Sequence, residues 1–167
     1  MESHSPRASD VLRSLIVYLR AAMPRLQDQA STLADELALV RAYLGLMQMR
    51  MPDRLRFAID VDRAQQHQRF PAMALLTLVE NAVRHGIDPS ETGGSIEVGG
   101  QASGSGLRLW VSDDGLGMSE QAQPGVGLTN LRARLAATYG PGATLELHEH
   151  TPHGLRAELF VPAASLS

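Results

Sequence analysis

An adjacent carboxylate and amide, Glu80 and Asn81, interrupt an otherwise apolar stretch of the chain. The amide oxygen suits Mg²⁺, which prefers oxygen ligands and is often held by few protein groups together with nucleotide phosphates. The neighbouring carboxylate could orient or deprotonate an attacking hydroxyl or water. The pair therefore suits phosphoryl transfer, although an ordinary amphipathic helix that ends in polar residues would show the same short pattern.

The residues around this pair have helical spacing. From Phe70-Pro71 onward, apolar positions recur at intervals of three and four, namely Leu75, Leu78, Val79 and Ala82. Pro71 suits the start of a helix and Gly86 its C-terminal cap. A neighbouring stripe consists of Thr77, Asn81, Arg84 and His85. This stripe would offer oxygen donors and cationic groups to a metal ion and phosphates beside the buried face.

A second segment ends in a carboxylate that is predicted to be buried. Leu107, Leu109, Val111 and Asp113 alternate with Arg108, Trp110 and Ser112, which is the period of a strand with one buried face. A buried Asp113 needs a partner, and the exocyclic amine of adenine is a suitable donor. The turn from Asp114 to Gly117 could supply positive φ angles and a close backbone approach for a flat base. A plain hairpin turn is the alternative, because Asp-Gly is common in turns.

A third segment, Gly125-Val126-Gly127-Leu128-Thr129-Asn130, leads into a helical pattern of Leu128, Leu131, Leu135 and Tyr139. Backbone amides at a glycine-rich helix start favour anions such as phosphates. Neither glycine segment completes the dinucleotide-binding pattern, because Glu120 and Asn130 stand where its third glycine would be. The chain also contains no Gly-x-x-x-x-Gly-Lys-Ser/Thr sequence, which disfavours a P-loop NTPase.

In order and spacing, the three segments resemble the N box, G1 box and G2 box of the GHKL ATPase superfamily, which includes the sensor histidine kinases. The resemblance predicts ATP binding and a Bergerat fold. This is an α/β (α+β) two-layer sandwich in which helices cover one face of a mixed sheet and ATP lies between the layers. Gly117 and Gly125 are only eight positions apart, so the lid over ATP is expected to be short.

Two helices are predicted before the first strand. Leu12, Leu15, Leu19 and Ala22 mark one helix, which Pro24 should end or kink. The second starts near Ser31-Thr32, where Thr32 and Asp35 can form a capping box, and closes at Pro52. Its apolar seam is typical of a helix bundle or short coiled coil and consists of Leu33, Leu37, Val40, Leu44, Met47 and Met51. This seam could meet a partner helix or pack on the domain's own core.

Strands are predicted at 55–61, 95–100, 107–113, 143–148 and 155–161. Gly99, Gly100, Gly104 and Gly106 mark a turn between two of them. A chain of 167 residues with 44% hydrophobic residues can bury one sizeable core. We divide it into a helical segment, 1–52, belonging to the dimerisation and phosphoacceptor region, and an ATP-binding domain, 53–167.

The composition of the chain limits the cellular locations, binding partners and types of chemistry that are expected. No apolar run approaches the ~20 residues needed to span a bilayer, and no secretory signal is visible. The net charge of -3 is too small and mixed to favour nucleic acid or an anionic membrane surface. The absence of cysteine excludes thiol chemistry and thiolate metal sites.

The resemblance extends to the LytS-like family of sensor histidine kinases. Thr32 to Arg54 looks like the segment that precedes the ATPase domain in this family, and Ala8 to Arg20 like the helix before it. The family implies transfer of the γ-phosphoryl of Mg-ATP to a histidine and then to a response-regulator aspartate. It also implies a homodimer in the full-length protein and a cytoplasmic catalytic part. Anchorage of the full-length protein in the inner membrane is left open.

Carried over by position, the resemblance assigns a role to each candidate site residue. Asn81 would be the magnesium ligand, Glu80 the catalytic base or orienting group, and Asp113 the adenine partner. The remaining nucleotide contacts would come from Arg84, His85, Gly115, Gly117, Gly125, Gly127, Leu128 and Thr129.

The family's phosphoacceptor histidine lies in an Asn-Pro-His-Phe-like motif that has no counterpart here. His4 lies in a polar tail and His67 in a polar loop, so both are poor substitutes. His148, His150 and His153 lie near a strand end and turn and are close enough to bind a metal, but nothing else in the sequence supports a metal site there. We therefore expect a fragment that starts just after the phosphoacceptor. Two alternatives stay open: an anti-sigma-factor-type serine kinase, and a non-catalytic interaction module regulated by nucleotide.

Overall fold

The protein contains a five-stranded mixed sheet. The computed structural model describes residues 6–27, 30–117 and 125–163. The strand order is β2-β4-β5-β7-β6, with bounds Leu55–Val61, Gly94–Ser103, Gly106–Asp113, Leu155–Pro162 and Thr144–Glu149 respectively. β2 is parallel to β4, and the other three neighbouring pairs are antiparallel. All five strands predicted from the sequence are therefore present, and their register forms the mixed sheet that was expected.

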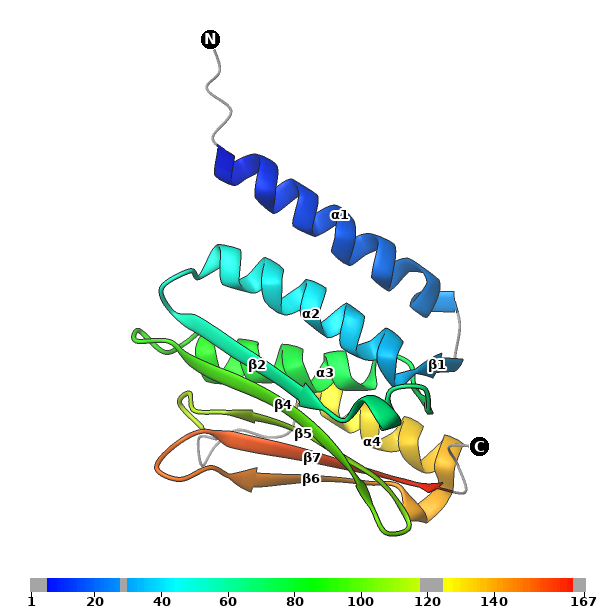
Figure 1. Ribbon diagram of the computed structural model, residues 1–167. Coiled ribbons are helices and arrows are strands. Elements are labelled where there is room, and N and C mark those ends of the chain that lie inside the picture. Colours follow the sequence, from blue (N-terminus) through cyan, green and yellow to red (C-terminus); the bar gives the residue numbers. More distant parts are fainter. Residues whose placement is uncertain (1–5, 28–29, 118–124, 164–167) are drawn as a thin grey trace.

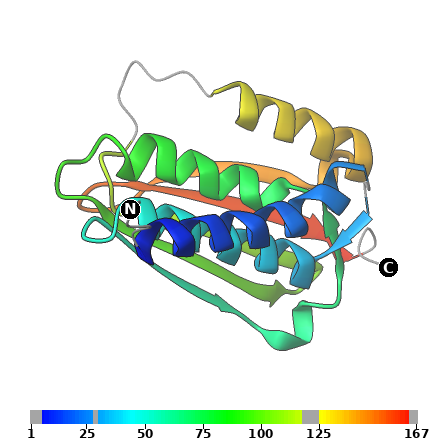
Figure 2. The same cartoon turned by 90° about the horizontal axis from the view of Figure 1, so that it is seen from above.

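Helices cover one face of this sheet (Figures 1 and 2). They are α2 (Leu33–Arg50), α3 (Ala74–Asn81) and α4 (Val126–Tyr139). Each helix buries an apolar stripe, on which Leu37, Leu78 and Leu131 are at most 3% exposed. Inward-facing strand residues such as Val98 and Leu109 complete the same hydrophobic cluster. The two-layer α/β arrangement follows from these two apolar surfaces, because each can be buried only against the other.

The remaining long helix, α1 (Pro6–Gln27), lies against α2 on the side away from the sheet (Figure 1). The rings of Tyr18 and Tyr43 meet across this hairpin, with centroids 6.0 Å apart. Of the two effects predicted for Pro24, an end or a kink, the end is not observed, because the helix continues to Gln27. A proline this close to the end of a helix removes only one backbone hydrogen bond, and few residues of the helix follow it. Among the described residues, no helix has both the length and the apolar character that crossing a membrane requires.

α2 packs on the main core rather than on α1 alone. The predicted capping box between Thr32 and Asp35 is present at its start. The seam residues Leu33, Leu37, Val40, Leu44 and Met51 belong to the same cluster as α3 and the sheet, and Met47 packs against that cluster. Of the two interpretations left open for this seam, packing on the domain's own core is the one observed.

Two predicted boundaries of the helix that carries Glu80 are wrong. Pro71 lies in a short strand, β3 (Arg69–Pro71), which pairs with β1 (Ala30–Thr32), and α3 begins only at Ala74. Strands of three residues are too short to be recognised by their periodicity. At the other end, Gly86 is not a cap, because the helix continues as a π-helix over Ala82–Ile87.

The glycines around β4 also differ from the prediction. Gly99 and Gly100 lie inside the strand, whereas the turn is formed at Gly104, where φ is 42°. A Cβ atom at Gly99 would lie 2.2 Å from the ring of Trp110 on the neighbouring strand. The absence of a side chain at Gly99 therefore makes room for an indole on the open face of the sheet.

Candidate nucleotide-binding site

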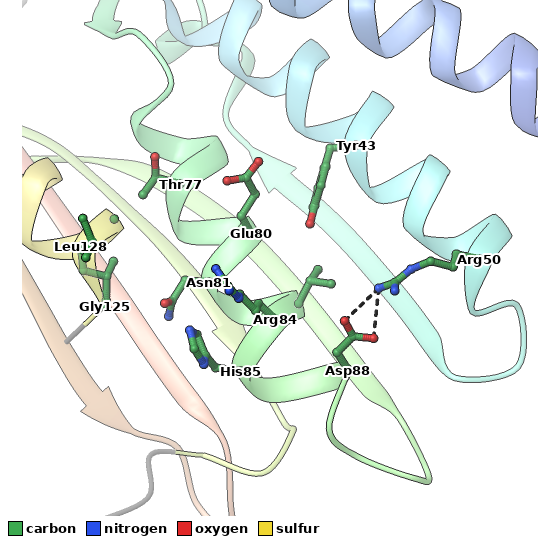
Figure 3. A pocket seen from close by; sticks show the side chains of 13 residues that line it. Tyr43, Arg50, Thr77, Glu80, Asn81, Arg84, His85, Asp88, Gly125 and Leu128 are labelled. Atoms are coloured by element: carbon green, nitrogen blue, oxygen red, sulfur yellow. Dashed lines mark hydrogen bonds and ion pairs between the residues drawn. The ribbon is translucent and has the colours of Figure 1, made fainter. Parts of the chain in front are cut away.

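A cavity of about 540 Å³ lies along the helix formed by α3 and the π-helix (Figure 3). Tyr43 and Arg50 of α2 line one side, and the start of α4 lines the other. The cavity brings together eight of the residues that contribute to the predicted site: Thr77, Glu80, Asn81, Arg84, His85, Gly125, Gly127 and Leu128. Segments that are far apart in the sequence thus meet around one opening.

The helix presents different chemistry to the two sides of the cavity. In Figure 3, Asn81 and His85 point toward Gly125 and Leu128 at the start of α4, and Glu80 points toward Tyr43. Asn81 and His85 are four residues apart, so they lie one above the other on the same helical face. One side therefore carries an amide and an imidazole, and the other side a carboxylate and a phenol.

The carboxyl group of Glu80 lies in a partly desolvated environment. Although Glu80 is exposed as a residue, the protein atoms around its carboxyl group displace water and raise its pKa. Burial also raises the pKa of Tyr43 to about 12, and the negative charge of Glu80 adds to this effect. Burial and the same charge raise the pKa of Tyr18 on α1. Glu80 is thus electrostatically coupled to both tyrosines of the hairpin.

Two arginines attach the C-terminal end of the helix to neighbouring elements. Arg50 of α2 binds both carboxylate oxygens of Asp88, each at 3.0 Å. Arg54 donates from Nη2 to the carbonyl oxygens of Ile87, Asp88 and Ser90, at 3.2, 2.8 and 2.7 Å. The first of these carbonyls belongs to the last residue of the π-helix and the other two follow it, so the two arginines hold the end of the π-helix in place.

Asp113 is buried at the end of β5, as predicted, and is 4% exposed. Its Oδ1 accepts a hydrogen bond of 3.0 Å from the N–H of Gly115. Desolvation raises the pKa of Asp113 to about 6, and the charge of Asp114 adds to the shift. Hydrogen bonds from the backbone N–H groups of Gly115 and Leu155 partly offset the rise in pKa, as does the electrostatic influence of His150. Because these interactions only partly compensate the cost of burying the carboxylate, it is suited to accept a further hydrogen bond.

The turn after Asp113 has the conformation expected from its glycines. Gly117 has a φ of 77°, and a Cβ at Gly115 would lie 2.1 Å from the carbonyl oxygen of Gly86. The N–H of Leu116 donates to that same oxygen at 3.2 Å. The turn therefore lies directly against the π-helix, and the missing side chain of Gly115 allows this contact. The close approach to a flat base stays a prediction.

The start of α4 faces the cavity beside Asn81. Gly125 is extended, with φ -61° and ψ 162°, and precedes the first helical turn. Leu128 is buried, and a Cβ at Gly127 would lie 3.6 Å from Cγ2 of Thr77. The first amides of a helix have no carbonyl partner within it, so this end of α4 suits an anion.

Other predicted site residues lie outside the cavity lining. Asp113 and Gly115 lie against Gly86, which follows the lining residue His85, whereas Gly117 packs against Gly154 and Thr129 is exposed on α4. The predicted lid, 118–124, lies outside the described residues, as does His4. Conversely, two residues that line the cavity, Tyr43 and Arg50, were not predicted from the sequence. Their spacing of seven residues suggests only a shared helical face.

A family model described as histidine kinase-, DNA gyrase B-, and HSP90-like ATPase matches residues 66–165, which include the whole N-box helix, the turn after Asp113 and the start of α4. The chain belongs to this ATPase family. A second family model, described as histidine kinase, matches residues 1–55. The two matches together cover the helical hairpin and four of the five strands of the sheet, leaving out most of β2.

Curated relatives are sensor histidine kinases. The chain is 28% identical over 159 residues to the sensor histidine kinase YesM of Bacillus subtilis, covering 92% of this chain and 27% of that protein. It is 31% identical over 157 residues to the sensor protein LytS of Staphylococcus saprophyticus, covering 86% of this chain and 27% of that protein. The chain therefore resembles LytS and YesM but spans less than a third of their length.

Solved structures share the fold at low sequence identity. The histidine kinase domain of the blue-light activated kinase of Erythrobacter litoralis superposes with a TM-score of 0.58 at 17% identity, covering 98% of this chain and 78% of that one. The catalytic domain of the histidine kinase ThkA gives a TM-score of 0.60 at 15% identity, covering 80% of this chain and 94% of that one. The Bergerat-type sandwich predicted from the three boxes is confirmed by these neighbours.

Proposed function

We propose that this chain is the ATP-binding catalytic part of a two-component sensor histidine kinase. In this function, it transfers the γ-phosphoryl of Mg-ATP to a histidine of another segment, from which a response regulator receives it. The observation that carries the proposal is the cavity in which Glu80 and Asn81 meet the glycine-rich start of α4. Membership of the ATPase family and similarity to LytS and YesM support it.

The arrangement suits a nucleotide that lies along the helix, with its base near Asp113 and its phosphates near Asn81. Gly86, which touches Asp113, and Asn81 are five residues apart, which is about one turn where the helix continues as a π-helix. The amine of adenine would donate to Asp113 beside Gly115 and Gly117. The phosphates would then reach Arg84, His85 and the first amides of α4 at Gly125, Gly127, Leu128 and Thr129.

A magnesium ion fits the phosphate end of this arrangement. Asn81 presents an amide toward the side of the cavity where α4 begins (Figure 3). One protein oxygen is sufficient when phosphate oxygens and water supply the remaining ligands, and Mg²⁺ would neutralise phosphate charge during transfer. Glu80 would orient or deprotonate the incoming nucleophile from the side that faces Tyr43.

Calorimetric titration with ATP tests the binding site. Asp113→Ala should lose a charge-assisted hydrogen bond of roughly 1.5–3 kcal/mol, which corresponds to about one to two decades in affinity. Asp60→Ala, which removes an exposed carboxylate on β2, is the matched control and should bind ATP like the parent chain. Unchanged ATP affinity in a folded Asp113→Ala variant would remove the proposed base site.

Phosphoryl transfer from radiolabelled ATP separates the three candidate functions. We expect this chain to bind ATP without labelling itself, because its histidines lie in no acceptor-like motif. An added acceptor segment from a LytS-like kinase should gain an acid-labile phosphohistidine. Acid-stable phosphoserine on a partner would instead favour the anti-sigma-factor-type kinase, and binding without any transfer would favour the nucleotide-regulated module.

The proposed partners are a response regulator and, in the full-length kinase, a second copy of this chain. ThkA, a structural neighbour, has been solved in complex with the response regulator TrrA. The dimer proposal rests on α1, whose exposed apolar side chains include Leu12, Ile16 and Leu19. The ATP site would lie on the cytoplasmic side, where ATP and response regulators are present.

A further inference from the structure

The loop between β6 and β7 lies against the turn that follows Asp113. Nδ1 of His153, in this loop, is 2.9 Å from the carbonyl oxygen of Gly115. A carbonyl can only accept, so Nδ1 carries the proton in this contact. The contact joins residues 38 positions apart and brings the β6–β7 loop to the predicted base-binding turn.

The peptide between Gly115 and Leu116 is held at both ends. Its carbonyl accepts from His153, and its N–H, which belongs to Leu116, donates to the carbonyl of Gly86 at 3.2 Å. The preceding N–H, that of Gly115, donates to Asp113 Oδ1 at 3.0 Å. His153 is therefore connected to the carboxylate of Asp113 through one residue of the turn.

The β6–β7 loop packs so closely against the turn after Asp113 that the turn has little room to move. Gly154 has a φ of 112°, and a Cβ there would lie 1.9 Å from the carbonyl oxygen of Asp113. A Cβ at Gly117 would lie 3.2 Å from the backbone nitrogen of Gly154. Leu155, the next residue, pairs with Asp113 in the β5–β7 register. The loop thus supports the turn from the side opposite the π-helix.

We propose that His153 is a positioning residue for base recognition. By holding the carbonyl of Gly115, it fixes the turn and aims the carboxylate of Asp113 at the exocyclic amine of the base. The inference rests on the proposed function, in which Asp113 binds adenine, and adds a residue that acts through the turn without touching the nucleotide.

The test compares ATP with purine riboside triphosphate, which lacks the exocyclic amine, by calorimetric titration. The parent chain should prefer ATP by about tenfold or more, the value of one charge-assisted hydrogen bond. His153→Ala should bind the analogue as the parent chain does but lose most of the preference, to about twofold. His153→Asn should retain the preference, because its amide can donate from nearly the same position as Nδ1.

His148→Ala is the matched control. His148 lies on β6 and its Nε2 is 3.2 Å from Glu146, so its removal should leave the preference unchanged. A preserved preference in His153→Ala, or equal weakening of both nucleotides, would overturn the proposal, as would failure of His153→Asn to retain the preference. If His153→Ala does not fold, the His153→Asn result decides. If Asp113→Ala loses the preference for ATP and His153→Ala keeps it, only the role of His153 is refuted. If Asp113→Ala keeps the preference, the proposed function of Asp113 is refuted.

Discussion

Asp113 and Gly86 are in direct contact between the end of β5 and the π-helix. A Cβ atom at residue 86 would lie 2.5 Å from Oδ1 of Asp113 and 2.7 Å from its Cγ. The proposed base-binding carboxylate therefore rests on the backbone of the helix that carries Asn81. This contact joins the two ends of the proposed nucleotide site.

Gly86→Ala should displace Asp113. We expect overpacking to reduce the free energy of unfolding by about 1–3 kcal/mol and to weaken ATP binding, because the carboxylate or the helix must move. Gly45→Ala is the control, since a Cβ at this position in α2 meets nothing within 4 Å. That change should stabilise the helix by roughly 0.5–1 kcal/mol and leave ATP affinity unaltered. Thermal melting and calorimetry measure both effects, and a tolerated alanine at residue 86 would contradict the contact.

ATP affinity should depend on the ionisation of Asp113. Burial raises the pKa of this carboxyl group from its ordinary value of 3.8 to about 6. The ionised form accepts more strongly from the adenine amine, so affinity should fall as the pH is lowered through about 6. Titrations from pH 5 to pH 8 check this, with purine riboside triphosphate as the ligand whose binding should change less.

The ionisation of Asp113 should affect the stability of the nucleotide-free protein in the opposite sense: stability should fall, rather than rise, as the pH increases. The native state holds the proton of Asp113 more tightly than the unfolded state, so the free energy of unfolding falls as the pH rises from about 4 to about 6. A shift from 3.8 to about 6 corresponds to about 3 kcal/mol in total. Asp113→Asn removes this titration and should be more stable than the parent chain at pH 7. Equal denaturation midpoints at pH 4 and pH 7 for both proteins would show that Asp113 is not buried.

Asn81→Ala should separate the metal from the base. Because Asn81 is proposed as a single protein ligand to Mg²⁺, its loss should weaken Mg-ATP binding roughly tenfold but leave metal-free ATP binding nearly unchanged. Asp113→Ala should weaken ATP with and without magnesium. Calorimetry in magnesium and in a chelator gives the comparison, and Mg-ATP binding by Asn81→Ala at parental affinity would exclude this ligand.

Glu80 should influence the titration of the hairpin tyrosines. The pKa values of Tyr18, Tyr43 and Tyr139 are all raised, so the folded protein should show less tyrosinate absorbance at pH 10 than the unfolded chain, in which tyrosine is about half ionised. Glu80→Gln removes the negative charge that raises the pKa of Tyr18 and Tyr43, and their titration should move to lower pH. Glu91→Gln, at an exposed glutamate outside the site, should leave the titration unchanged. An identical curve for Glu80→Gln would contradict the orientation of Glu80 in Figure 3.

Local patterns in the sequence were sufficient to predict the five strands, the capped α2 and the burial of Asp113. Each of these depends on neighbours along the chain: alternation for a strand, and a hydroxyl three residues before a carboxylate for the cap. The glycine segments likewise indicated the helix start at Gly125, whereas phosphate binding there stays a prediction. Such features depend on backbone geometry over a few residues and can therefore be predicted without knowledge of the tertiary structure.

Tertiary structure alone decided the features that join distant segments. Gly86 has the pattern of a helix cap, yet its missing side chain accommodates Asp113 of β5 and the helix continues past it. The seam of α2 has the spacing of a coiled coil, yet it is buried against α3 and the sheet. Tyr43 and His153 show no sequence pattern that connects them with Glu80 or Gly115. Periodicity specifies which residues share a face, but only the packed fold determines what that face meets.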